Sequence, residues 1–210
     1  GRSRRAAARR ATHRTQMVSR APAFAARAPV RASEPVGTPA AEVQIMKVTP
    51  ETKKQRLIAD LAEARSALLQ AALFLPPVAQ DTPFLGAWSA HDIVAHLIGW
   101  DHANLEAIEA VLAGRLPAFY AAYDPDWRSF NTQLVRQHKQ PSLAATLAAA
   151  QASHLALLDR LEALPAGDML RDAGVRSPRG RRVTIGMLLT AEAGDERKHA
   201  DHIRTFALRF

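Results

Sequence analysis

The chain has no cysteine among its 210 residues, which excludes disulfide bonds, thiolate zinc sites and cysteine nucleophiles. Any metal must therefore be held by histidine and carboxylate side chains. Aromatic residues make up only 6% of the chain, and no segment alternates convincingly between apolar and polar residues, so few strands are expected. The apolar runs are short and interrupted, and we expect none of them to enter a membrane. The length is sufficient for one domain with a sizeable core.

Acidic residues are absent from the first 33 positions, where nine arginines lie. The formal net charge of +8 therefore comes from this N-terminal segment, because residues 34–210 keep 19 of the 28 basic residues against all 20 acidic ones. A DNA-binding domain should carry its positive charge on the folded surface. The charge distribution thus predicts that nucleic acid is not a partner of the folded domain.

Residues 1–46 are rich in Arg, Ala, Ser, Thr and Pro and lack the central apolar run of a secretory signal. This composition predicts a disordered N-terminal transit peptide and linker. We expect an organellar protein and favour the chloroplast over the mitochondrion. The alternative is a disordered basic tail that contacts RNA or anionic lipid.

Residues 47–210 are predicted to form one helical domain, because apolar residues recur at steps of three and four. Thr49 followed by Pro50 is typical of a helix start, and Ser89 with Asp92 resembles a capping box. Each long helix has one apolar face, which favours packing into a bundle. We therefore predict an all-α fold, an antiparallel four-helix bundle with an additional short helix. The predicted helices cover residues 50–75, 90–113, 125–138, 141–164 and 184–210.

The predicted last helix carries ionisable residues in the middle of the stripe that we expect to face inward: Glu192, Asp195, His199 and His202. Buried groups of this kind must be hydrogen-bonded, paired or bound to metal. Asp195 and His199 lie one helical turn apart and can bind one ion, with His96 of the second helix as a third ligand. Such a site would suit Zn²⁺, Ni²⁺ or Fe²⁺ with one coordination position open. The alternative is an Asp–His network that fixes helix register.

Roles can also be predicted for Glu192, His202 and His154. Glu192 or His202 is expected to move protons in catalysis, and Glu192 could instead orient a ligand or act as a general base. His154 is a single histidine on an apolar stripe, so we predict a hydrogen-bonded core residue there.

Two tryptophans and one basic loop are candidate substrate contacts. Trp88 and Trp100 are interpreted as packing anchors rather than as substrate platforms. Four arginines of the predicted loop at residues 165–181 and just after it could clamp an anionic substrate, although a solvated linker is the favoured interpretation. These are Arg176, Arg179, Arg181 and Arg182.

Three segments resemble the DinB-like superfamily, which includes the maleylpyruvate-isomerase-type thiol transferases and the ClbS/DfsB group. Residues 88–100, with the sequence WSAHDIVAHLIGW, resemble the opening of the second helix in that superfamily. Residues 126–131, DWRSFN, resemble an Asp-x-x-x-x-Asn element of the ClbS/DfsB group. Residues 195–203, DERKHADHI, resemble the closing His-x-x-x-His segment, and the similarity spans residues 50–210.

The resemblance implies a four-helix bundle in which many members hold a metal with three histidines. His96 matches the first ligand and His199 the third, whereas Asp195 stands at the middle position. The expected function is metal-dependent action on a small electrophilic metabolite, as a hydrolase or a thiol S-transferase in detoxification. No thiol cofactor can be assigned. The alternative is a non-catalytic bundle that binds a small molecule or a protein partner, and homodimer formation is left open.

Overall fold

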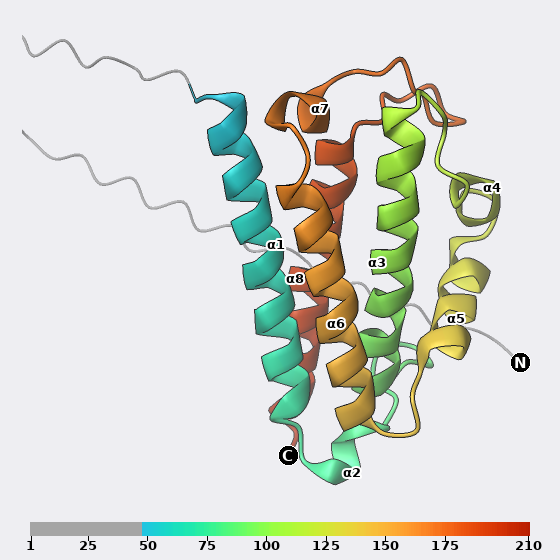
Figure 1. Cartoon of the computed structure of the whole chain (residues 1–210). Coiled ribbons are helices and arrows are strands. Elements are labelled where there is room, and N and C mark those ends of the chain that lie inside the picture. The colour runs from blue at the N-terminus through green and yellow to red at the C-terminus, as the bar shows by residue number, and fades with distance from the viewer. Residues whose placement is uncertain (1–47) are drawn as a thin grey trace, which may run out of the picture. The chain divides into compact units, whose positions relative to one another are not determined.

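The computed structural model describes residues 48–210, which form a bundle of helices (Figure 1). The predicted transit peptide and linker at residues 1–46 lie outside the described residues, and both the leader and its organelle remain predictions. Within residues 48–210, every helix is too short or too polar to cross a membrane.

Four long helices build the bundle: α1 (Pro50–Leu73), α3 (Ala90–Leu112), α6 (Leu143–Glu162) and α8 (Ile185–Ala207). In Figure 1, α1 and α8 run in one direction and α3 and α6 in the other. α1 packs along α8, and α3 packs along α6. The shorter α5 (Trp127–His138) lies against the outer side of α3. This arrangement confirms the predicted all-α, four-helix bundle with an additional short helix.

Three very short helices lie in segments that the sequence analysis treated as loops: α2 (Pro77–Gln80), α4 (Tyr120–Tyr123) and α7 (Ala166–Leu170). A helix of one turn is too short to show the 3.6-residue periodicity on which the prediction depends. The long helices all lie within the predicted ranges, and their ends differ from the prediction by a few residues.

The two helix starts predicted from capping residues are confirmed. The Thr49 side chain accepts a hydrogen bond from the Thr52 amide at the start of α1. Ser89 and Asp92 form a complete capping box at the start of α3, in which each side chain accepts from the other's backbone amide. The fixed start of α3 sets which of its residues face the bundle interior.

The core consists of two apolar clusters, one towards each end of the bundle. Between them lies a layer of four buried polar side chains, one from each long helix, which we call the polar layer. Its members are Arg65, Asp101, His154 and Glu196. The polar layer corrects the predicted inner stripe of the last helix, because Glu196 faces the core whereas Asp195 and His202 are exposed.

α5 approaches α3 closely at Gly99. A Cβ atom at this position would lie 2.7 Å from the Leu134 Cβ atom, so only glycine fits without a shift of one helix. The close contact places the N-terminal half of α5 beside the face of α3 that carries His96 and Trp100.

Candidate metal centre and pocket

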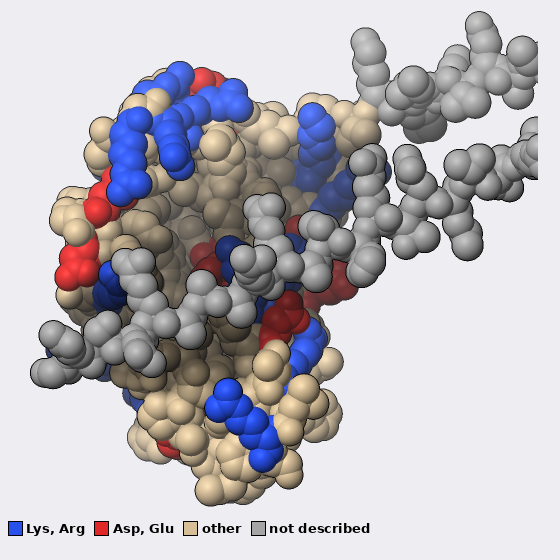
Figure 2. All heavy atoms as spheres, turned by 180° about the vertical axis from the view of Figure 1, so that it is seen from behind, with Lys and Arg blue, Asp and Glu red and all other residues tan. Residues whose placement is uncertain are grey.

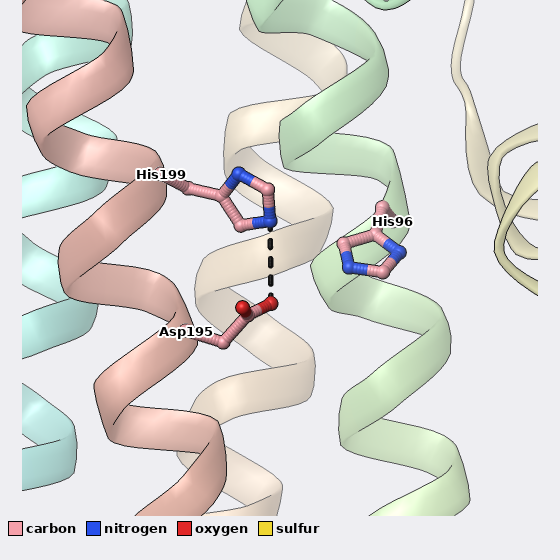
Figure 3. A group of neighbouring side chains, drawn as sticks. All are labelled: His96, Asp195 and His199. Carbon is pink, nitrogen blue, oxygen red and sulfur yellow. Dashed lines mark ion pairs between the residues drawn. The ribbon is translucent and has the colours of Figure 1, made fainter. Parts of the chain in front are cut away.

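His96, Asp195 and His199 come together between α3 and α8 (Figure 3). One potential ligand atom of each residue lies within 4.8 Å of those of the other two. The His199 Nε2 atom lies 3.2 Å from the Asp195 Oδ2 atom, and the His96 and His199 ring centroids are 5.7 Å apart. The structure therefore assembles the three residues that the sequence analysis proposed as metal ligands.

The chemistry of these side chains fits a divalent metal. Burial, together with the nearby His199, lowers the pKa of His96 to about 3, so its ring is neutral at pH 7, as a metal ligand must be. A hydrogen bond with His199 lowers the pKa of Asp195, which is therefore ionised. The Nδ1 atoms of His96 and His199 are buried and have no hydrogen-bond partner within residues 48–210. Two imidazoles and one carboxylate suit Zn²⁺, Ni²⁺ or Fe²⁺.

The three residues lie in the wall of a cavity of about 820 Å³, and the hollowed face is visible in Figure 2. α8 forms one wall of this pocket. The opposite wall is aromatic and comes from α3, α4 and the start of α5. All three tryptophans of the chain, Trp88, Trp100 and Trp127, line the pocket. The interpretation of Trp88 and Trp100 as packing anchors is thus incomplete, since both face the cavity.

Trp100 is the centre of the aromatic wall. Its ring centroid lies 5.3 Å from that of Phe119, 5.4 Å from that of Tyr123 and 5.5 Å from that of Phe130. The Trp100 Nε1–H group donates a hydrogen bond to the Asn131 Oδ1 atom at 3.2 Å. These contacts fix the indole in one orientation, so the wall is formed before any ligand binds.

The Asp-x-x-x-x-Asn element supports this wall at both ends. The Asp126 carboxylate accepts hydrogen bonds from the Arg128 and Ser129 amides and caps α5. Asn131, five residues later, holds Trp100. The sequence analysis could assign no role to this pair, because neither contact is visible without the arrangement of α3 and α5.

Glu192 lies one turn before Asp195 and lines the same pocket. Burial raises the pKa of Glu192 well above its usual range, and the nearby Glu196 and Asp101 carboxyls raise it further. The Asn104 Nδ2–H group donates to the Glu192 Oε2 atom at 3.3 Å. The raised pKa favours the protonated form of Glu192, which suits a proton donor better than the general base suggested from sequence. His202, the other predicted proton carrier, is exposed and does not line the pocket.

The polar layer lies directly behind Glu192. The Arg65 guanidinium donates to both oxygens of Asp101, at 2.8 Å and 2.9 Å, and to the Glu196 Oε1 atom at 2.7 Å. Burial alone would lower the pKa of Arg65, but the two carboxylates raise it above that of a free guanidinium. Asp101, His154 and Glu196 also lie close enough to hold a metal. Because Arg65 already occupies these carboxylates, a second cation is disfavoured there.

His154 is buried in this layer, as predicted, but it is not the hydrogen-bonded core residue that we expected. Neither ring nitrogen has a hydrogen-bond partner within the described residues, and the Nδ1 atom lies 3.8 Å from the Asp101 Oδ1 atom. Arg65 and Ser153 satisfy Asp101 instead, with the Ser153 hydroxyl donating to its Oδ2 atom at 2.5 Å.

Comparison with known proteins identifies the fold family. A model of the DinB superfamily matches residues 60–203, more than half of the chain. The chain belongs to this superfamily. No curated protein matches the chain significantly.

Two solved structures of DinB-like proteins share the fold. The colibactin self-resistance protein ClbS, solved in complex with double-stranded DNA, superposes with a TM-score of 0.60 at 16% identity and covers 73% of this chain and 94% of its own. YfiT from Bacillus subtilis, described as a probable metal-dependent hydrolase with an unusual four-helix bundle topology, gives a TM-score of 0.57 at 20% identity. The match covers 78% of this chain and 90% of YfiT.

The ClbS structure overturns the prediction that excluded nucleic acid, because a protein of this fold is solved bound to a DNA duplex. The prediction averaged charge over the whole domain, whereas a duplex meets one face only. Residues 171–182 carry five arginines and one acid. Figure 2 shows Lys and Arg side chains gathered at the end of the bundle where the segment between α7 and α8 lies. A domain with balanced charge can thus present a basic surface.

Proposed function

We propose that this DinB-superfamily protein is a metal-dependent enzyme that acts on a small electrophilic molecule, by hydrolysis or by transfer to a thiol. The observation that carries the proposal is the position of His96, Asp195 and His199 in the wall of a preformed cavity of about 820 Å³. A small polar cluster in a largely apolar pocket is typical of a ligand site. The description of YfiT as a probable metal-dependent hydrolase supports the same function.

The side chains that line the pocket have separate roles in the proposed reaction. His96, Asp195 and His199 would hold the ion, which supplies Lewis acidity to a nucleophile or to an electrophilic group when it is bound. Burial favours the protonated form of Glu192, so this side chain can donate a proton to a leaving group or to a developing anion. The aromatic wall excludes water from one side of the pocket and positions a flat substrate. A non-catalytic bundle would not require these residues to lie near the cavity.

The proposal is tested with the purified full chain, stripped with a chelator and then reloaded with Zn²⁺, Ni²⁺ or Fe²⁺. Wild type should take up about one ion per chain, measured by elemental mass spectrometry. It should then accelerate hydrolysis of an activated aryl ester, or conjugation of a chlorodinitroarene with one of a panel of low-molecular-weight thiols. The His96→Ala variant should lose both the ion and the rate. Glu192→Gln should keep the ion and lose about 10²- to 10⁴-fold in kcat, because the amide cannot donate a carboxylic proton.

His102→Ala is the matched control, because His102 lies on α3 but is exposed and away from the pocket. It should retain both metal and rate. Wild-type protein that stays metal-free after reloading would contradict the proposal and favour a bundle that only binds a small molecule or a partner.

A second candidate function, contact with the phosphate backbone of DNA, is favoured by the arginines of residues 171–182 and by the DNA complex of ClbS. Arg171 and Arg176 are paired with Asp168 and Asp172. The other three arginines are exposed and form no ion pair within residues 48–210. These are Arg179, Arg181 and Arg182.

Replacing these three arginines with alanine in the full chain should weaken duplex binding, measured by fluorescence anisotropy. The slope of log affinity against log salt should fall by about 2–3, because each lost phosphate contact removes about 0.9. The control replaces three exposed arginines elsewhere, Arg56, Arg136 and Arg209, so that total charge and the N-terminal arginines are the same in both variants. Equal slopes in the two triple variants would exclude this surface as the DNA contact.

A further inference from the structure

Apart from the candidate metal ligands, positive side chains outnumber negative ones around the pocket. Burial raises the pKa of Glu192 and so favours its uncharged form, and Asp195 is paired with His199. Two cationic side chains, Arg128 on α5 and Lys198 on α8, also line the cavity. Neither forms an ion pair with any residue of the described chain, and both are exposed at the pocket's edge. The cavity therefore has two positive side chains at its rim that form no ion pair within the described residues.

The inner surface is shaped for a flat group. Trp100 and Tyr123 contact each other edge to face, and Phe119 and Tyr120 stack with ring centroids 4.5 Å apart. Their rings and that of Trp127 form a continuous aromatic wall opposite α8. The Arg128 guanidinium lies 4.5 Å from the Trp127 ring centroid, so this cation is held at the edge of the aromatic wall. Aromatic or conjugated groups gain more than saturated ones from stacking on such a surface.

From these two features we propose that the pocket selects a flat aromatic or conjugated molecule that carries a carboxylate. The ring system lies against Trp100 and Tyr123, and the carboxylate lies at the rim between Arg128 and Lys198. This inference deepens the proposed function by naming a substrate class for the same pocket. The reaction of that substrate rests on the proposed function, whereas its binding does not.

A cationic ligand is the main competitor, because aromatic walls also bind ammonium groups. Two observations favour an anion. Arg128 and Lys198 line the rim without an ion-pair partner in the described chain, and the raised pKa of Glu192 favours its uncharged form. Each of these raises the potential in the cavity, and a positive cavity concentrates anions.

The test is a calorimetric titration of the full chain with three probes: 2-naphthoate, the neutral 2-naphthamide of the same shape, and the saturated cyclohexanecarboxylate. Each is measured with metal-stripped and with zinc-loaded protein. In the stripped protein, naphthoate should bind about ten-fold more tightly than naphthamide, since two partly exposed charge pairs contribute modestly. Naphthoate should also bind at least about ten-fold more tightly than cyclohexanecarboxylate, because the saturated ring loses the stacking contacts.

Variants separate the contribution of the two rim cations from that of the aromatic wall. Arg128→Gln and Lys198→Gln should each reduce the preference for naphthoate over naphthamide about three-fold, and the double variant should abolish it. Tyr123→Ala should weaken both naphthyl probes equally. Arg136→Gln, an exposed change on the same helix as Arg128, is the control and should change nothing.

Equal affinities for naphthoate and naphthamide in the stripped protein, or a preference that survives in the double variant, would overturn the inference. The titration of metal-stripped protein tests this inference independently of the proposed function. A chain that binds no metal can still show the preference, and a metal-loaded active chain without the preference would refute only the substrate class.

Discussion

Replacing Arg65 with methionine is expected to destabilise the fold by about 3–5 kcal/mol, because the change leaves two buried carboxyl groups without their cation. Arg65 donates three hydrogen bonds to Asp101 and Glu196 and one to the Ala150 carbonyl oxygen at 3.0 Å. Methionine fills much of the same volume, so the loss reports the charges rather than a cavity. The free energy of unfolding is obtained from urea denaturation of the full chain, followed by circular dichroism at the helical band.

The matched control is Arg56→Met, an exposed arginine of the same helix, which should change the free energy of unfolding by less than about 0.5 kcal/mol. A triple variant, Arg65→Met with Asp101→Asn and Glu196→Gln, should recover part of the loss because no unpaired charge remains. A loss in Arg65→Met no larger than in Arg56→Met would show that the polar layer does not stabilise the bundle. Failure of the triple variant to recover would assign the loss to packing.

The polar layer also shows how far the sequence could predict this core. Arg65 lies four residues after Leu61 and three before Leu68, and all three residues are buried on one face of α1. Asp101 has the same relation to Leu97 and Asn104 on α3. A charged residue on an apolar stripe was therefore a visible signal on α1 and α3. The partners were not predictable, because pairing depends on which helices face each other at one level.

The sequence of α8 contains two neighbouring stripes of residues that could face the interior. One contains Asp195, His199 and His202, and the other contains Glu196, Ala200 and Ile203. The first stripe was predicted to face the interior because steps of three and four connect its residues to apolar residues near both ends of the helix. In the structure the second stripe faces the core and the first lies at its border, where Asp195 and His199 reach the pocket and His202 faces solvent.

The pocket itself was beyond prediction from sequence for a different reason. His96, Asp195 and His199 could be proposed from their spacing and from family resemblance, and the helices place them together. Apart from Trp100 on α3, the aromatic wall comes from α4, a four-residue helix in a segment with no periodic pattern, and from α5. Its position depends on the close contact between Gly99 and Leu134, a feature of packing between two helices that no local pattern encodes.

The second large effect is expected at Asp195, the position where this chain departs from the three-histidine pattern. Asp195→Ala should weaken metal binding by more than about 100-fold, since even removal of groups that only orient ligands costs about 10- to 100-fold. Asp195→His should restore binding to within about ten-fold of wild type, because imidazole binds Zn²⁺ and Ni²⁺ well and the position lies one turn from His199. The affinity is measured by competition with a chromophoric chelator, and the stoichiometry by elemental mass spectrometry.

Asp201→Ala provides the control for this series, because Asp201 is an exposed carboxylate on the same helix whose ion pair is with Arg204. It should leave metal affinity unchanged. The alternative of a purely structural Asp–His network makes a different prediction: no variant in the series would alter metal uptake, and the largest response would be a small change in the free energy of unfolding. Because Asp195 is half-exposed, that change should stay near 0–1 kcal/mol, roughly the range of exposed ion pairs. Retained metal affinity in Asp195→Ala would therefore remove Asp195 from the ligand set and show that other groups hold the ion.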